Sequence, residues 1–481
     1  MILKMEPNFY ERYYICRNVD EFYKNFNVTA KYSVPFSTNE LALAIRNVIL
    51  QTPALVHNFF RDGTEKSDRK KAGKNFIKRP VAKISVDDIL VVLPDEVPIG
   101  DEYFKRLNNV KFAMDVEKPL WNLYVAYYQG NQYLSYITDH SLVDGTCGVS
   151  FHQDLLRELV QIQGVKSDPL EVIFNSDTDI LPPLPPTTDK IAPILQPSIW
   201  YAAKLVFIEF IMPEYVLNFI RKWTDPESTD TSKNPLFTYK PTFRNVPTFY
   251  KLINLTPDEV KSMLSFTKSR KVTFSSYISA IGSHVMQDVI FPRISAKDFS
   301  SSVEIAINGR RYYPGEKALR YAFFVSIVEP TIGPFPKKAS VSSVEKAMNR
   351  IDKSINDALG DASLFSLLGM LRYVNPWDYL HGKLGKNSRS TISLSNLGNA
   401  IVREKDIEVD DLIFSQDLGL TSHIGLTSVG TPRGGFNILI NYFDYIEELV
   451  NPDTKQKAID EFSREFHRRL VEYARENTEE I

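Results

Sequence analysis

The sequence predicts a mixed α/β protein built from two halves of similar construction. Both halves contain segments whose apolar residues alternate, as in strands, and segments whose apolar residues recur at helical spacing. The apolar content of 43% over 481 residues is enough for one large core or two medium ones. Six prolines in residues 180–197, ILPPLPPTTDKIAPILQP, interrupt any helix or central strand there. We therefore expect an N-terminal domain at residues 1–175 and a C-terminal domain at 246–481, joined by a linker and crossover segment at 176–245.

Each half opens with a predicted strand that is followed by a capped helix. Residues 27–34 suit a strand. After it, Ser37 and Glu40 have the spacing of a capping box, and apolar residues at helical spacing follow them. In the second half, residues 248–255 alternate, and residues 256–259 supply an N-cap Thr, a first-turn Pro and an N3 Glu. Residues 301–311 then alternate as a strand that ends on two arginines.

An apolar stretch, residues 198–223, follows the proline-rich linker. Lys204, Glu209 and Glu214 interrupt it and Pro213 should kink it, so it carries too much charge to span a bilayer. It is also too apolar for a solvated linker. We expect this stretch to be buried against the body of the protein, and the alternative is a helix that lies in a membrane interface.

The stretch YLSYITDHSLVDGTCG, residues 133–148, carries the clearest chemistry. It closes a predicted hairpin over residues 121–141 with a Gln-Gly-Asn turn, and a helix should run from about Thr146 to a stop at Gly164. His140 therefore lies at the end of a strand, where regular secondary structure holds it in place. Catalytic groups are often found at such positions.

Histidine in this position could serve as a general base. Its reference pKa of about 6.5 leaves the imidazole of His140 mostly neutral at pH 7, able to take a proton from a hydroxyl or an amine. Asp144 and Gly145 suit a turn whose carboxylate bonds backbone amides or pairs with an arginine. The spacing alone leaves a structural interpretation open, because a strand-end histidine often has a structural role and Asp-Gly is a common turn pair.

Composition and motifs exclude several other classes of protein. The 57 basic and 59 acidic residues nearly cancel and are not clustered, so we expect no nucleic-acid partner. The remaining histidines lack the paired spacing of a zinc site, so we predict no metal. The sequence has no G-x-S-x-G elbow, P-loop or Rossmann fingerprint. Cys147 is expected to fill a buried position in the helix rather than act as a nucleophile.

With its H-x-x-x-D-G motif after a strand, the sequence resembles the CoA-dependent acyltransferase superfamily, and within it the fungal alcohol O-acetyltransferase family. The resemblance covers most of the chain in the family's order. Beyond DHSLVDG it rests on NGRRYYP (308–314), SLSNLGNA (393–400), VDDLIFSQDLGLTSHIGLTSV (409–429) and GGFNILINYFDY (434–445). It implies two lobes like chloramphenicol acetyltransferase, each a mixed sheet flanked by helices, with a channel between them.

The resemblance also implies roles for single residues. His140 matches the general base, Asp144 matches an aspartate that pairs with an arginine, Arg310 matches that arginine, and Gly145 the turn glycine. Three residues could contact the oxyanion or the substrate, namely Ser393, Ser395 and Asn396. The alternative is that they belong to an ordinary strand that ends in a glycine turn. A basic cluster that could reach the phosphates of coenzyme A, or simply form a solvated face, consists of Lys268, Arg270 and Lys271.

Two departures from the wider superfamily stand out. The D-F-G-W-G stretch of the plant-type acyltransferases is replaced by FSQDLG at residues 414–419, which favours the fungal branch. The Gly-Asn pair that often follows the NGR strand is not visible in residues 314–324, so the lining of the donor channel is not fixed by the resemblance.

The sequence thus predicts an enzyme that transfers an acetyl group from acetyl-CoA, as co-substrate with no permanently bound cofactor, to an alcohol hydroxyl. Alternatives are N-acetylation of a long-chain, sphingoid-like amino alcohol or related lipophilic amine, and an inactive homologue that only binds lipid or CoA. Four aromatic residues near the motif are expected either to line the acceptor side of the channel or to pack in the core, namely Tyr133, Tyr136, Phe323 and Phe324.

We expect a cytoplasmic protein, because the chain has only two cysteines and no uncharged apolar run of 18 residues. We also expect it to be a monomer. The segment 453–477 forms an amphipathic helix whose apolar side is most simply explained by core packing. Peripheral contact with endoplasmic reticulum or lipid droplets, known for relatives with terminal amphipathic helices, is the alternative.

Overall fold

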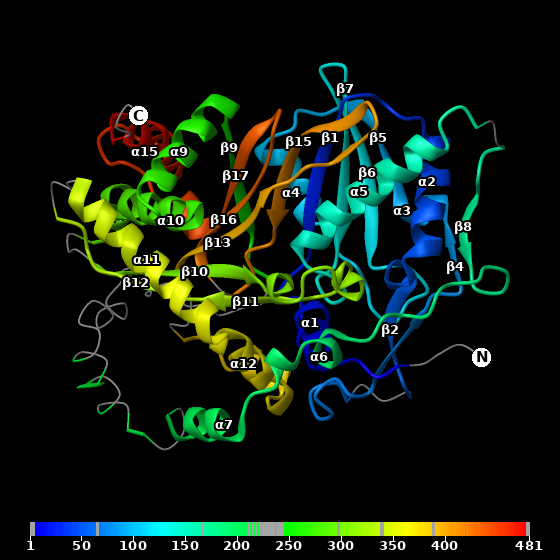
Figure 1. Cartoon of the computed structure of the whole chain (residues 1–481), viewed down its shortest axis with the longest axis horizontal. Helices are drawn as coiled ribbons and strands as arrows, with labels where there is room; N and C mark the ends of the chain where they lie inside the picture. The colour runs from blue at the N-terminus through cyan, green and yellow to red at the C-terminus, as the bar shows by residue number, and fades with distance from the viewer. Residues whose placement is uncertain are drawn as a thin grey trace.

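The structure is a computed structural model, and it shows two β-sheets side by side with helices on their outer faces (Figure 1). It describes residues 5–477 except 64–66, 166–167, 209–211, 214–215, 217–218, 221–222, 224–235, 237–244, 296–298, 337–340, 387–389 and 421. This arrangement confirms the predicted mixed α/β fold with two lobes.

The N-terminal lobe is built on a six-stranded sheet. Its strands, in spatial order, are β14 (Arg403–Glu404), β15 (Ile407–Gln416), β1 (Phe26–Tyr32), β7 (Asn131–Thr138), β6 (Trp121–Tyr128) and β5 (Leu90–Glu96). Helix α5 (Gly145–Gln161) packs on this sheet, and α2 (Thr38–Gln51) packs on α5. The β6–β7 hairpin turns at Gln129 and Gly130, both with positive φ, as its Gln-Gly-Asn sequence predicts.

The C-terminal lobe is built on a seven-stranded sheet. Its order is β11 (Val325–Val328), β10 (Ser301–Asn308), β13 (Ser390–Asn399), β16 (Ser422–Thr431), β17 (Gly435–Phe443) and β9 (Thr248–Leu255), and β12 (Thr331–Ile332) also pairs with β10. The pairs β10/β13 and β13/β16 are parallel and the others antiparallel. Helices α9 (Pro257–Ser269), α10 (Phe274–Val285), α11 (Val341–Asp361) and α15 (Ala458–Asn477) form the layer over this lobe (Figure 1).

The two lobes exchange parts of the chain. Strand β15 lies in the second half of the sequence, yet it pairs with β1 in the N-terminal sheet, where Leu412 and Phe414 enter that lobe's core. Conversely, helix α1 (Phe9–Val19) places Phe9 and Tyr10 in the core of the C-terminal lobe. The lobes are therefore not separated at a single point in the sequence.

The remaining elements are short. They are β2 (His57–Arg61), β3 (Phe76–Pro80), β4 (Lys83–Ser85), α3 (Val86–Ile89), α4 (Asp101–Asn108), β8 (Val172–Asn175), α6 (Thr188–Ile191), α7 (Ile199–Val206), α12 (Ser363–Gly369), α13 (Pro376–His381) and α14 (Asp444–Glu447).

The apolar stretch at residues 198–223 corrects the sequence prediction. Helix α7 lies away from both sheets at the lower edge of the molecule (Figure 1), with Ile199 and Trp200 each 86% exposed. Trp223, at the other end of the stretch, is 82% exposed. The expectation of burial is wrong for the described residues, because the body's cores are already closed by other elements; Glu209 and Glu214 lie outside the described residues.

The C-terminal amphipathic helix, in contrast, is used for packing. Its apolar side contributes fully buried side chains to the core of the C-terminal lobe, namely Ile459, Phe462, Phe466 and Leu470. This face of α15 is therefore occupied by protein. Within the described residues, no helix is both long enough and apolar enough to cross a membrane.

Candidate active site

His140 lies in the turn between β7 and α5. The strand ends at Thr138 and the helix begins at Gly145, so the motif occupies the connection itself. The preceding residue, Asp139, holds the turn, because its carboxylate accepts hydrogen bonds from the backbone N–H of Ser141 at 2.8 Å and from Asn18 Nδ2 at 2.7 Å. The imidazole is therefore carried on a connection fixed at both ends.

The hydrogen bond of the ring fixes which nitrogen carries the proton. His140 Nδ1 lies 2.8 Å from the carbonyl oxygen of Val143. A carbonyl oxygen can only accept, so Nδ1 must be the protonated nitrogen in this contact. In the neutral ring, Nε2 is then left with a free lone pair. This is the tautomer that a general base requires.

The surroundings keep the imidazole neutral. The pKa of His140 is lowered to about 4, mainly by burial and also by the positive charge of Arg17, while Asp144 opposes the shift. Some of the residue nevertheless remains accessible to solvent. At neutral pH the ring is therefore unprotonated and can still be reached.

Four aromatic rings surround His140. Tyr14 stacks on the imidazole with centroids 4.6 Å apart, Phe26 lies at 4.9 Å, Phe323 at 5.4 Å and Tyr23 at 5.7 Å. Of these, only Phe323 was singled out from the sequence. Tyr14 comes from α1, Tyr23 from the connection after it and Phe26 from the start of β1. The density of aromatic residues in this tract is its only visible signal in the sequence.

Arg17 is a second group that sequence reasoning missed. Its guanidinium lies 4.2 Å from the ring centroid of Tyr23 and 5.1 Å from that of Tyr14, the two tyrosines that flank His140. The residue is only 8% exposed, and none of the described carboxylates lies within ion-pair distance of it. Stacking on aromatic rings offsets only part of the free-energy cost of removing the Arg17 charge from water.

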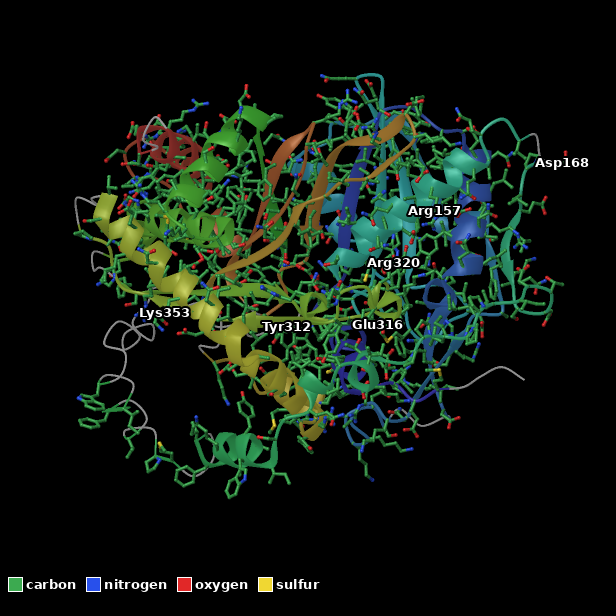
Figure 2. The ribbon with its side chains drawn as sticks, viewed as in Figure 1. Arg157, Asp168, Tyr312, Glu316, Arg320 and Lys353 are labelled. Carbon is green, nitrogen blue, oxygen red and sulfur yellow. The ribbon has the colours of Figure 1, made fainter. Side chains whose placement is uncertain are left out.

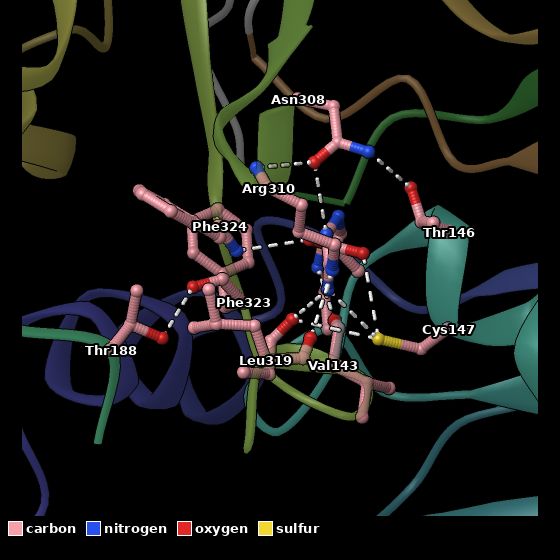
Figure 3. A network of polar contacts seen from close by, with 12 residues as sticks. Val143, Thr146, Cys147, Thr188, Asn308, Arg310, Leu319, Phe323 and Phe324 are labelled. Atoms are coloured by element: carbon pink, nitrogen blue, oxygen red, sulfur yellow. Dashed lines mark hydrogen bonds and ion pairs between the residues drawn. The ribbon is translucent and has the colours of Figure 1, made fainter. Parts of the chain in front are cut away.

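Asp144 and Arg310 form the ion pair that the sequence predicts. Arg310 Nη1 donates to Asp144 Oδ2 at 2.8 Å, and the same oxygen accepts the backbone N–H of Phe324 at 2.9 Å. Arg310 Nε also donates to the carbonyl of Leu319, and Figure 3 shows this network together with Cys147. Because Asp144 belongs to the N-terminal lobe and Arg310 to the C-terminal lobe, the pair joins the His140 turn to the other lobe.

Gly145 and Cys147 are explained by their surroundings. A Cβ on Gly145 would lie 3.0 Å from the ring of Phe414 and 3.1 Å from Leu397, so the position is limited by space; its φ is not in the left-handed region. Burial raises the pKa of Cys147 to about 12, with Asp144 adding to the shift. The thiol is therefore protonated at neutral pH.

Strand β13 brings part of the proposed oxyanion segment toward the motif. Leu397, which would touch a Cβ at Gly145, lies on the same face of β13 as Ser393 and Ser395, because strand residues alternate. Ser393 accepts a hydrogen bond from Ser422 at 2.8 Å. Asn396 points to the opposite face, where it donates to Ser275 on α10. The structure therefore places Asn396 away from the face that carries the two serines.

The basic cluster lies in the helical layer of the C-terminal lobe. Arg270, which caps α9, pairs with Glu345 at 2.8 Å and donates to the carbonyl of Asn477. Lys268 and Lys271 are exposed beside it. These contacts join α9 to α11 and α15, and none of them reaches the rings around His140.

The aromatic residues predicted near the motif divide between core and site. Tyr136 is fully buried and stacks on Phe151 at 4.1 Å. Phe324 is also fully buried and packs on Phe365 at 5.3 Å. Phe323 alone of the four contacts His140, whereas Tyr133 is partly exposed on β7.

A cavity of about 430 Å³ lies beside the motif. Its lining includes Ser141 and Leu142, which follow His140, together with Phe323 and residues 184–188 of the proline-rich stretch. Arg157 and Arg320, labelled in Figure 2, both pair with Asp154 at 2.8 Å in its wall. The described residues contain no cluster of three or more side chains suited to hold a metal ion.

The two lobes thus meet beside His140, in a turn that the Asp144–Arg310 pair ties to the opposite lobe. The chain belongs to the alcohol acetyltransferase family, whose sequence model matches residues 9–469. It is 23% identical to an uncharacterized protein of Schizosaccharomyces pombe over 449 residues, which cover 90% of this chain and 91% of that protein.

Solved structures share the fold. Trichothecene 15-O-acetyltransferase from Fusarium sporotrichioides matches with a TM-score of 0.63 and 13% identity, covering 98% of this chain and 95% of that one. The first condensation domain of the calcium-dependent antibiotic synthetase, bound to a substrate analogue, matches with a TM-score of 0.61 and 11% identity, covering 98% and 97%. At these identities the likeness concerns the fold alone.

Proposed function

We propose that the protein transfers an acetyl group from acetyl-CoA to an alcohol hydroxyl, with Nε2 of His140 as the general base. The observation that carries this proposal is the hydrogen bond from Nδ1 to the Val143 carbonyl, which leaves Nε2 free in a ring that is neutral at pH 7. Membership of the alcohol acetyltransferase family supports a hydroxyl as the acceptor.

In this mechanism, the acceptor hydroxyl gives its proton to Nε2 as its oxygen attacks the thioester carbonyl. The carbonyl electrons move to oxygen and form a tetrahedral oxyanion. When the carbonyl reforms, the carbon–sulfur bond breaks, and the departing sulfur takes the proton from the imidazolium. The products are the acetyl ester and free coenzyme A, and no acyl-enzyme is formed.

Two further groups support this chemistry. Ser393 and Ser395 are proposed as hydroxyl donors toward the oxyanion, because their face of β13 also carries Leu397, which reaches Gly145. A donor of this kind typically contributes about 2.7–4 kcal/mol. Asp144 and Arg310 are proposed to hold the turn, and with it the Val143 carbonyl, in place. We assign no CoA contact to Lys268, Arg270 and Lys271 on the basis of the contacts described above.

The proposal includes a setting for the enzyme. We propose a cytoplasmic monomer that touches a lipid surface through the exposed side chains of Ile199, Trp200 and Trp223, in place of the C-terminal helix, whose apolar face is buried. Tryptophan is favoured at membrane interfaces, which makes Trp200 and Trp223 the main contacts of this proposal.

The experiment that tests the function is incubation of the purified protein with labelled acetyl-CoA and a panel of alcohols and long-chain amines, read by mass spectrometry. We expect acetyl esters with the wild type and none above background with His140→Ala. His467→Ala, on the outer side of α15, serves as the matched control and should retain activity. Amides in place of esters would favour the amine alternative, and no acetylated product at all would favour a protein that only binds lipid or CoA.

A further inference from the structure

Glu304 is an ionisable residue in the sheet of the C-terminal lobe that the mechanism does not use. Along β10, Val303 and Ile305 point into the core under the helices, so Glu304 between them points to the opposite face. Its partner across the parallel pairing is Ser393, one of the proposed oxyanion serines. Glu304 is partly exposed, so solvent reaches it.

The carboxylate of Glu304 has no hydrogen-bond or ion-pair partner among the described residues. The nearby Glu329, in contrast, accepts a hydrogen bond from Ser390 at 2.6 Å. The pKa of Glu304 is raised to about 7, mainly by burial and also by the charge of Glu329, while Lys383 and Arg17 oppose the shift. A partly desolvated carboxyl that the protein leaves unbonded is costly unless something else bonds to it.

Glu304 faces the same side of the C-terminal sheet as its strand partner Ser393, and strand β13 reaches the His140 turn where Leu397 lies against Gly145. The electrostatic influence of Glu304 reaches Tyr13 and Arg17 on α1. The ring of Tyr13 packs edge-on against Tyr14 at 5.2 Å, and Tyr14 stacks on His140. Side chains of helix α1 therefore lie near both His140 and the carboxyl group of Glu304.

We propose that Glu304 binds a second hydroxyl group of the acceptor, so that the substrate is a diol or polyol rather than a simple alcohol. This inference rests on the proposed function, because it concerns the acceptor of that same site. One hydroxyl is acetylated at His140, and the other hydrogen-bonds to Glu304 while it remains unmodified.

The groups around Glu304 suit a hydroxyl. Glu329 and the cations Arg17 and Lys383 act on this carboxyl with opposite sign, and none of the described carboxylates pairs with either cation within ion-pair distance. A hydroxyl can both donate to a carboxylate and accept from a cation, whereas an ammonium can only donate. A hydroxyl can also pair with Glu304 when that carboxyl is protonated, since it can then accept.

The test compares kcat/KM for 1-octanol, for octanediols with hydroxyls at increasing separation, and for 2-amino-1-octanol. We expect the wild type to prefer at least one diol to 1-octanol by about 10- to 100-fold, the usual range for a hydrogen bond to a charged group. Glu304→Met, which keeps the size and removes the polar group, should abolish this preference by raising the KM of the diol. Glu329→Gln, which removes a neighbouring charge that has its own partner, should retain the preference.

Glu304→Gln is the second variant, because it keeps a hydrogen-bonding group and should retain part of the preference. The inference is overturned if the wild type treats 1-octanol and every diol alike, or if a folded Glu304→Met or Glu304→Gln enzyme fails to lower the preference. A preference for the amino alcohol that depends on Glu304 would assign an ammonium subsite and would overturn the hydroxyl assignment. If no acceptor of any kind is acetylated, the proposed function itself fails, and this inference fails with it.

Discussion

Replacing Asp144 by alanine should destabilise the protein by about 3–5 kcal/mol, the usual cost of leaving one member of a buried ion pair without its partner. The side chain of Asp144 is fully buried and that of Arg310 is 16% exposed. The substitution removes the only carboxylate that pairs with Arg310 among the described residues, and it also removes the acceptor of the Phe324 N–H. Both groups would remain largely out of water.

The size of this effect can be judged against a surface pair in the same protein. Asp357 pairs with Lys353 on α11, and their side chains are 66% and 75% exposed. Exposed pairs contribute about 0–1 kcal/mol, so Asp357→Ala should cost no more than that. Urea unfolding followed by circular dichroism measures both variants, as the change in transition midpoint multiplied by the slope. If Asp144→Ala loses no more stability than Asp357→Ala, the claim that a buried pair ties the lobes together is wrong.

Three further predictions concern charge and surface. Arg17→Gln should move the acid limb of the kcat/KM pH profile to higher pH, because Arg17 lowers the pKa of His140. Arg17→Lys keeps the charge and should leave the acid limb in place. Identical acid limbs in the wild type and both variants would contradict this. Burial lowers the pKa of His57 and of His152 to about 4, so the unfolded chain takes up protons below about pH 6.5 while the folded protein does not. The free energy of unfolding should therefore fall as the pH falls from about 6.5 to 4, by on the order of 3 kcal/mol for each histidine, and a flat profile in urea titrations would refute it. Trp200→Ser should weaken flotation with lipid vesicles without changing the melting temperature, and equal flotation of both proteins would remove the lipid-surface proposal.

Local signals in the sequence predicted local structure well. The capping boxes at residues 37–40 and 256–259 are both present, because a cap depends on side chains only three residues apart. The hairpin turn at residues 129–130 is also where its Gln-Gly-Asn sequence places it. The pairing of Asp144 with Arg310 was predicted through a resemblance, since nothing local in the sequence relates two residues so far apart.

Features that depend on distant parts of the chain could not be read in this way. Residues 409–429 were singled out only through the family resemblance, and nothing in their sequence shows that β15 pairs with β1 in the other lobe. The stacking of Tyr14 on His140 and the position of Arg17 follow from where α1 packs, and a helix dense in aromatic residues fits many surfaces. The exposure of Trp200 was missed because hydrophobicity measures the gain from burial and not whether the fold has a place to bury the residue.

The central claim is that Nε2 of His140 takes the proton of the attacking hydroxyl. The most direct measurement is kcat for acetyl transfer to one accepted alcohol by wild type and His140→Ala, together with the Kd of acetyl-CoA for each. General-base catalysis contributes typically 10²–10⁴-fold, so kcat should fall by about that factor while the Kd stays within about threefold. A folded His140→Ala enzyme with near-normal kcat would contradict the assignment of His140 as the base.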